Sequence, residues 1–586
     1  MLVTGAAIAG LPAIAQQAAP PQQSPSPTTY PPRPVIGEAP AAQPQPSAAQ
    51  PGATGRSGDE SAVELVSALT PPAPLRASEY PAFARRDSWT VGVLDPAAAG
   101  LGASPWRGAS GAFLSTLMRR METPLASRWA HIALRDGLLV RARAPREVNP
   151  VDWVAERAWL LLRLGEADAA RMLISGVDTD RFTPKMVQVA VQSALATADP
   201  SALCPLESGI RKHDPNVRAL VQAMCSSLSG EPEAAAAQID DARRRGRIGG
   251  IDLTLAEKVV GAGANTGRVV TIEWEPVDHL TAWRFGLATG TGMIPPARLL
   301  SRAPPRLLAF QARSPLLSPA QRLDAAFIAA GLGVFSSQAM IDLYSSIYDS
   351  TDPDDLSNSD AWQLRQAFVA KEPDARLAAI RRVLALGKDP LSKEAARAAA
   401  GRAATLVEPD AALQKDAPEL ISAMLAAGYD RAAARWSAAV RRMDDEDADR
   451  CWAMLALAAP DAGSLDLSFS RISSFVGRDK SRDKYRSTLL VAGLAGLGRI
   501  SESTANSLNR RYGLGLARHS NWTRLIDAAA ARGQGGTVLV MVGTAFQTPS
   551  FRDVPAAYMF HSVWGLQRTG QDFHARMLAA EALSRT

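Results

Sequence analysis

Two of the three cysteines in this 586-residue chain stand at a spacing that suits a disulfide bond. The pair Asp214-Pro215 combines a helix N-cap acceptor with a proline suited to the first helical position, so it predicts a turn between helices at about 203–212 and 217–228. Cys204 lies ten residues before Asp214 and Cys225 eleven after it. In an antiparallel hairpin the two thiols come to the same height, so we predict that they are bonded.

A disulfide of this kind implies an oxidising compartment, and it would stabilise the hairpin by about 3 kcal/mol through loop closure. Cys451 lies in an apolar run and is expected to be a buried free thiol. The alternative is that all three cysteines are unrelated core residues.

Motifs of catalytic type occur without the partners that their chemistry needs. Ser481-Arg482-Asp483-Lys484 has the Ser-x-x-Lys spacing in which lysine activates a serine, but no Lys-Thr-Gly or Ser-Asp-Asn element accompanies it. The glycine-rich run 261–267 looks like a dinucleotide loop, yet it follows a helical pattern at 253–260 rather than a strand. We therefore expect no catalytic residue and no cofactor, and we interpret 261–267 as a joint.

Metal-ligand patterns are equally incomplete. The six histidines have no metal-ligand spacing, and the Asp-rich run 349–360 lacks the glycine and the terminal glutamate of an EF-hand loop. We expect no metal site, and a solvated turn at 349–360.

Arginine carries almost all of the positive charge, which gives a net charge of +6. Two clusters follow predicted helices, where cations complement the helix dipole. As an alternative, they form one surface for an anionic polymer. The clusters are Arg141, Arg143 and Arg146, and Arg243, Arg244, Arg245 and Arg247. Nucleic acid is not an expected partner.

The elements that position these residues follow a recurring turn. Gly165, Asp199-Pro200 and Gly230 each precede an Ala-rich segment, at intervals of 34 and 31 residues, and Gly428, Gly498 and Gly570 follow at 70 and 72. Intervals near 33 residues are typical of two-helix repeats.

The composition favours helices throughout, since 47% of the residues are hydrophobic but only 6% are aromatic. We predict an all-α fold, an α-solenoid of antiparallel helix hairpins, preceded by a disordered Pro-rich segment. The expected parts are an irregular N-terminal cap at 59–105, repeats at 106–250, a joint at 251–295 and a second repeat segment at 296–586.

The N-terminus predicts export. Residues 1–15 form an apolar stretch that ends in Ala13-Ile14-Ala15, a signal-peptidase pattern, and 16–58 is a Pro/Ala/Gln-rich linker. At 15 residues the stretch is too short to span a bilayer. We expect a periplasmic protein of a Gram-negative bacterium that is not transmembrane after cleavage, and the sequence leaves its oligomeric state open.

Around Gly165 and Gly230 the sequence resembles tetratricopeptide-type repeats, in which the second helix often opens with Gly-x-x-x-x-Ala. The resemblance implies a helical scaffold that binds other molecules. The consensus aromatic and proline positions do not recur regularly, so the peptide-binding residues of that family cannot be transferred to this chain.

These observations favour a noncatalytic periplasmic helical-repeat scaffold or binding protein, whose partner is a protein or an envelope polymer. One alternative is an accessory factor of cell-wall or envelope-polysaccharide metabolism that binds anionic glycan through its arginines. The other is an enzyme whose site the sequence does not reveal.

Overall fold

The computed structural model describes residues 82–210, 215–246, 248–264, 271–516 and 518–586. From Arg86 onward these residues form one compact unit, whereas Ala82–Ala84, a turn of 3₁₀ helix (η2), belongs to a separate unit. The predicted signal sequence and Pro-rich linker lie outside the described residues.

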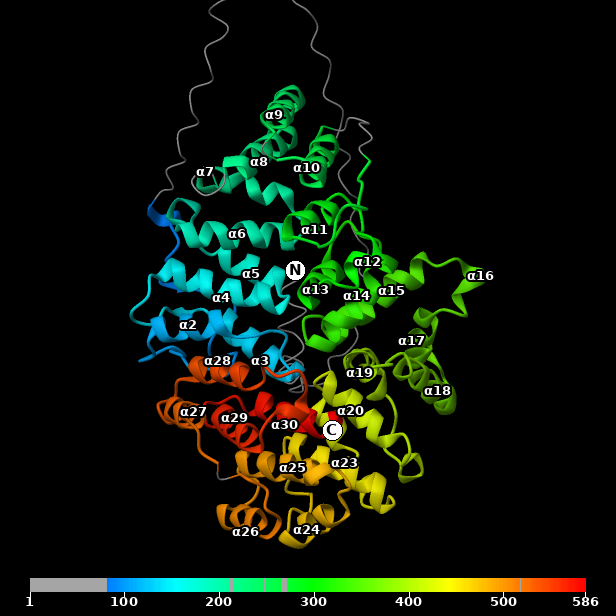
Figure 1. Cartoon of the computed structure of the whole chain (residues 1–586). Coiled ribbons are helices and arrows are strands. Elements are labelled where there is room, and N and C mark those ends of the chain that lie inside the picture. The colour runs from blue at the N-terminus through cyan, green and yellow to red at the C-terminus, as the bar shows by residue number, and fades with distance from the viewer. Residues whose placement is uncertain (1–81, 211–214, 247, 265–270, 517) are drawn as a thin grey trace, which may run out of the picture. The chain divides into compact units, whose positions relative to one another are not determined.

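The described chain is all-α apart from one small ribbon, as predicted (Figure 1). The first group of helices contains α2 (Gly111–Arg120), α3 (Arg128–Leu139), α4 (Pro150–Leu164), α5 (Ala167–Ile174), η3 (Thr179–Arg181), α6 (Pro184–Ala196), η4 (Pro200–Leu206), α7 (Glu207–Ile210), α8 (Pro215–Leu228) and α9 (Pro232–Arg245).

The second group contains α10 (Gly250–Gly263), α11 (Ala282–Thr289), α12 (Ala297–Leu300), α13 (Pro305–Arg313), α14 (Pro319–Leu332), α15 (Ser337–Ser350), α16 (Pro353–Leu356), α17 (Asp360–Val369), α18 (Pro373–Leu384), α19 (Pro390–Ala404), η5 (Ala411–Leu413) and α20 (Ala417–Ala426).

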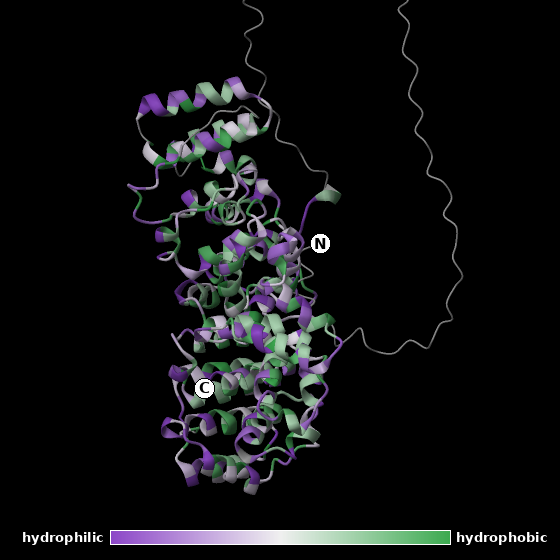
Figure 2. Cartoon of the chain, turned by 90° about the vertical axis from the view of Figure 1, so that its right-hand side faces the viewer, coloured by the Kyte–Doolittle hydropathy of each residue, from purple (hydrophilic) through white to green (hydrophobic). Residues whose placement is uncertain are grey.

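The third group contains α21 (Asp430–Ala434), α22 (Ser437–Val440), α23 (Asp445–Ala458), α24 (Phe469–Arg478), η6 (Arg482–Lys484), α25 (Tyr485–Gly496), α26 (Glu502–Tyr512), α27 (Asn521–Ala531), α28 (Gly535–Ala545), η7 (Phe551–Asp553), α29 (Ala556–Arg568) and α30 (Asp572–Arg585). Figure 2 shows hydrophobic and hydrophilic residues interleaved along these helices, as expected when each helix packs one face against its neighbours.

The turns predicted from the sequence share one backbone geometry. Gly165 adopts a left-handed conformation (φ 94°), its N–H donates to the carbonyl of Leu162 at 3.1 Å, and the N–H of Glu166 donates to that of Leu161 at 2.9 Å. The same bond pair recurs where Gly230, Gly428, Gly498 and Gly570 end their helices. This Schellman arrangement closes a helix and turns the chain into the next one.

Only at the Asp199-Pro200 turn does a non-glycine residue take the left-handed position among these predicted turns. Ala198 has φ 53°, and the N–H of Asp199 donates to the carbonyl of Ala194 at 3.0 Å. The repeat is therefore one of backbone geometry, and its residue types vary.

A buried arginine joins α4 to the ribbon. Strand β1 (Thr90–Val91) pairs antiparallel with β2 (Ala142–Arg143). The Arg157 guanidinium donates to the carbonyls of Leu138 at 3.0 Å, Val140 at 3.1 Å and Val91 at 2.8 Å. Arg157 therefore satisfies main-chain acceptors that the two-residue strands leave unpaired.

The first and last helices of the unit pack together. Helix α3 packs against α28 and α30, and α2 packs against α28, so the red C-terminal helices of Figure 1 adjoin the blue N-terminal ones. The N–H of Ala126 donates to the carbonyl of Phe546 at 2.7 Å, and that of Gly536 to Pro105 at 3.1 Å. The first helices therefore do not form a free end, a feature that the sequence did not predict.

Arg128 links α3 to the second group of helices. Its Nε donates to the carbonyl of Ala330 at 2.9 Å and its Nη1 to that of Ala426 at 2.6 Å, in the last turns of α14 and α20. A cation is favourable at a helix C-terminus. Burial lowers the pKa of Arg128 to about 10.

The predicted joint at 251–295 is more helical than expected. Helix α10 continues through Gly261 to Gly263, and α11 lies within the same segment. A Cβ at Gly263 would lie 2.7 Å from Ser227 Oγ, and that hydroxyl donates to the carbonyl of Val260 at 2.6 Å. Here glycine permits close packing of α8 and α10. Residues 265–270 of the predicted joint lie outside the described residues.

Candidate functional site

A pocket of about 880 Å³ lies between the first and second groups of helices. One side is formed by α5, η4 and the ends of α6 and α8, and the other by α13, α14 and α15, while the ends of α10 and α11 complete it. The volume falls in the range typical of small-molecule pockets.

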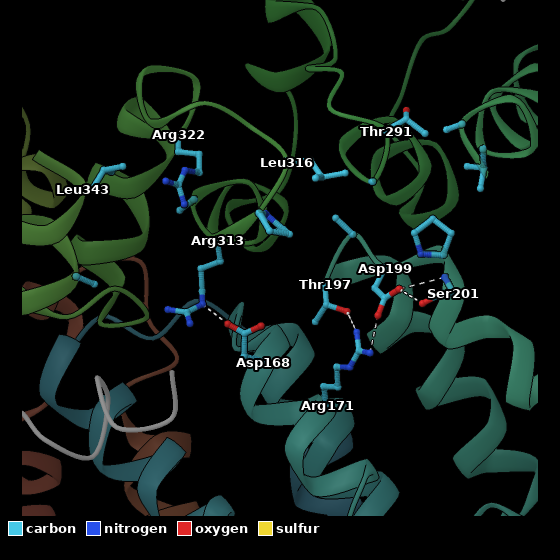
Figure 3. Close-up of a pocket in the computed structure, with 18 of the residues that line it drawn as sticks. Asp168, Arg171, Thr197, Asp199, Ser201, Thr291, Arg313, Leu316, Arg322 and Leu343 are labelled. Carbon is cyan, nitrogen blue, oxygen red and sulfur yellow. Dashed lines mark hydrogen bonds and ion pairs between the residues drawn. The ribbon is translucent and has the colours of Figure 1, made fainter. Parts of the chain in front are cut away.

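On one side of the pocket, Arg171 of α5 holds the turn after α6. Its Nη1 donates to Thr197 Oγ1 at 2.9 Å and its Nη2 to Asp199 Oδ2 at 2.6 Å (Figure 3). Burial favours the neutral carboxyl of Asp199, but hydrogen bonds from Ser201 and Arg171 outweigh it, so the pKa is lowered. Asp199 therefore carries a charge that Arg171 already neutralises.

A second ion pair joins the two sides of the pocket. Arg313, the last residue of α13, donates through Nε to Asp168 of α5 (Figure 3). The other N–H groups of Arg313 have no protein partner among the described residues. The pair ties α5 to α13 and leaves donors of Arg313 available.

Arg322 of α14 lines the same pocket without an ion pair to any described residue. Its Nε is buried and has no hydrogen-bond partner. Burial and the neighbouring charge of Arg313 lower the pKa of Arg322. Arg322 is therefore a partly buried cation whose charge the described part of the chain does not neutralise.

Apolar side chains form much of the remaining wall. Leu316 is 58% exposed and Leu228 43% exposed, which is unusual for side chains of this type. Phe335 and Leu343 line the pocket beside them. The pocket thus combines two arginines with an accessible apolar surface.

The hydroxyl groups of the pocket donate to the protein itself. Thr197 donates to the carbonyl of Ser193 at 2.9 Å, Thr291 to that of Leu287 at 3.0 Å, and Ser346 to that of Asp342 at 2.9 Å. No histidine, cysteine or tyrosine of the described chain lines this pocket. The groups present are suited to binding a ligand.

The predicted disulfide is confirmed. Cys204 of η4 and Cys225 of α8 are bonded, with 5.6 Å between their Cα atoms, and Cys451 is a buried free thiol. The first arm is not the continuous helix expected at 203–212, because it begins as η4, which contains Pro205, and continues as α7. Proline lacks the N–H that a helix interior needs.

The structure does not bring the two arginine clusters together in the part that it describes. Arg141, Arg143 and Arg146 are exposed on and around β2, where Arg143 lies over the Trp89 ring at 5.1 Å.

The second cluster ends α9, which packs against α8 and α10. Arg243 pairs with Asp240 and Glu257, and Arg244 and Arg245 both pair with Asp241. Arg247 lies outside the described residues.

The Ser-x-x-Lys motif serves the local fold. Lys484 donates through Nζ to the carbonyl of Val476 at 2.7 Å, and Ser481 Oγ accepts from the N–H of Arg486 at 3.0 Å. Across the described ranges, no cluster of His, Cys, Asp and Glu has an arrangement that could hold a metal ion. In the same ranges no helix combines the length and the apolar character needed to cross a bilayer.

Sequence reasoning did not identify Arg313 and Arg322. Each is one arginine among 64 basic residues, on helices separated in sequence from α5. Only folding brings them to one pocket, so no local motif could have revealed them.

Comparison of the chain with protein-family models, with curated proteins and with solved structures gives no match. The structure itself defines the class as an all-α protein of packed helices joined by recurring Schellman turns. Its largest described pocket lies between two groups of these helices.

Proposed function

We propose that this chain is a noncatalytic helical-repeat binding protein of tetratricopeptide-like type, and that it binds its partner in the pocket between α5 and α13–α15. The observation that carries the proposal is the pocket of about 880 Å³ whose walls come from two groups of helices. Helical repeats commonly bind other molecules on the surfaces that such stacking creates.

The composition of the wall supports binding. Its ion pairs, Arg171 with Asp199 and Arg313 with Asp168, hold the helices that form it. Leu316 and Leu228 stay accessible at the same time. Exposed apolar groups beside fixed polar groups are typical of ligand sites.

We further propose that the protein acts in the periplasm after export. The Cys204–Cys225 bond supports this location, since such bonds persist in oxidising compartments. The alternative function, binding of anionic glycan, has less support because the three described arginines at the end of α9 already pair with acidic residues.

Photocrosslinking in the cells that produce the protein tests the proposal. Leu316 is replaced by p-benzoylphenylalanine in one variant, and Leu525 of α27 in the control. Leu525 is 48% exposed and does not line the pocket. We expect one dominant cross-linked partner at position 316 that is absent at 525. Equal products at both positions, or none at either, would overturn the proposal, and sedimentation with peptidoglycan that is lost at high salt would favour the glycan alternative.

A further inference from the structure

Arg322 occupies an unfavourable electrostatic position that the fold does not explain. It lies in the first turns of α14, after the N-cap Ser318, where the helix dipole presents positive charge. The nearby charge of Arg313 adds repulsion, and no described acidic side chain pairs with Arg322. Sites that are unfavourable for stability are often those that bind a ligand.

The two arginines together suit a carboxylate. Figure 3 shows Arg322 and Arg313 at the same end of the pocket, near Leu316. Arg313 uses Nε for Asp168 and retains other donors, while Arg322 offers its whole guanidinium apart from the structure's own helix packing. Planar guanidinium groups bind carboxylates with charge-assisted hydrogen bonds.

The acidic residues of the wall leave this end positive. Asp168 and Asp199 are paired with Arg313 and Arg171. Asp342 of α15 accepts a hydrogen bond from Gln338 on its own helix at 2.8 Å. Arg322 thus provides the positive charge that has no acidic partner among these residues.

The rest of the pocket suits a short apolar chain with amide groups. Leu316 and Leu228 expose apolar surface, and α10 and α11 end at the pocket with Gly263 and Gly290 in its wall. The last turn of a helix has carbonyl groups without partners in the helix, and these accept peptide N–H groups.

We propose that Arg322 and Arg313 bind the C-terminal carboxylate of a peptide whose last side chain is apolar and lies against Leu316 and Leu228. This assignment rests on the proposed binding function and specifies its ligand. The ligand's carboxylate supplies the anion that Arg322 lacks, and its final side chain covers the exposed leucines.

Fluorescence anisotropy with the full chain tests the assignment. The probe is a pentapeptide labelled at its N-terminus and ending in leucine, compared with the same peptide as a C-terminal amide. Dodecanoate, a carboxylate without peptide groups, is the competitor. The variants are Arg322→Gln and, as a matched control, Arg302→Gln, an exposed arginine that does not line the pocket.

We expect saturable binding of the free acid, at least tenfold weaker binding of the amide, and at least tenfold weaker binding of the acid to Arg322→Gln. Arg302→Gln should bind as the parent protein does. The assignment is overturned if the acid does not bind, if the amide or Arg322→Gln binds equally well, or if dodecanoate displaces the probe at concentrations below those of unlabelled peptide.

Two features keep the test decisive. Circular dichroism verifies that Arg322→Gln is folded, and the acid and amide are compared on the parent protein, which needs no variant. A specific cross-link at position 316 together with no effect of Arg322→Gln would reject the carboxylate assignment while the proposed binding function stands. No specific cross-link at 316 would reject the binding function itself.

Discussion

Glu581 of α30 accepts a hydrogen bond from the hydroxyl of Ser127, the N-cap of α3, at 2.6 Å, although 454 positions separate the two residues. The same carboxylate accepts from the N–H groups of Arg128 at 2.8 Å and Trp129 at 3.0 Å. The last helix of the chain therefore caps the N-terminus of α3, where N–H groups have no partner within the helix.

Replacing this carboxylate should weaken the whole unit. Glu581→Ala leaves buried N–H groups of α3 without an acceptor and removes the partner of Arg585, which lies 2.9 Å away. Loss of one partner from a buried charged network costs about 3 kcal/mol. We expect a loss of that size in the free energy of unfolding, measured by urea denaturation.

The control for this variant is Glu273→Ala, at an exposed position outside the helices. It should change stability by less than about 0.5 kcal/mol, as is usual at such sites. Equal stability of Glu581→Ala and the parent protein would show that the contact between the first and last helices contributes little.

The relationship between Ser127 and Glu581 also shows where sequence reasoning reached its limit. The turns at Gly165 and Gly230 and the Cys204–Cys225 pair were predictable because each depends on residues near one another in the sequence. Backbone conformation and helix periodicity are local properties, and they define the hairpins.

The pocket and the contact between chain ends depend on residues far apart in the sequence. Arg313 pairs with Asp168 across 145 positions, and neither residue stands in a distinctive motif. Helix periodicity identifies the buried face of a helix but does not specify the helix that covers it. The packing of α28 and α30 on α3 was therefore outside what the sequence could indicate.

The disulfide should stabilise the protein in a way that reduction reverses. The bond closes a loop with a sequence separation of 21, which corresponds to about 3 kcal/mol in the chain-entropy treatment. We expect Cys204→Ser/Cys225→Ser to lose about that amount in urea denaturation. Reductant should lower the stability of the parent protein to the same level and leave the double variant unchanged, and sensitivity of the double variant would contradict this account.

Cys451 should be unreactive in the folded protein. Burial raises the pKa of its thiol from 9.0 to about 12, which lowers the thiolate fraction near pH 8 by about 1000-fold. We expect no modification by a disulfide reagent at pH 8 before unfolding, and one thiol per chain after unfolding without reductant. Three thiols would exclude the disulfide, and rapid native reaction would show that Cys451 is accessible.

Stability should fall in acid partly through Asp136. This carboxylate lies 3.0 Å from Arg135 and 3.6 Å from His574. Burial favours its neutral form, but Arg135 and His574 outweigh burial, so its pKa lies below 3.8. The unfolded chain then binds this proton first as the pH falls, so the contribution is present above about pH 4 and is lost below it.

Asp136→Asn should therefore lose less stability than the parent protein between pH 5 and pH 3, as followed by urea denaturation at each pH. Asp483→Asn, at an 89% exposed side chain, is the control. A parallel pH profile for Asp136→Asn and the parent protein would show that this carboxylate does not couple folding to protonation.

Arg322→Gln should make the ligand-free protein more stable. The substitution removes a partly buried cation that lies near Arg313 and in the first turns of α14. An unfavourable charge near a helix N-terminus costs about 0.3–1 kcal/mol, so a gain of that size is expected in urea denaturation, with no change in Arg302→Gln. If Arg322→Gln instead destabilises the protein, Arg322 stabilises the fold through contacts of its own. A gain in stability together with weaker peptide binding is the combination expected of a residue whose charge serves a ligand at the expense of the fold.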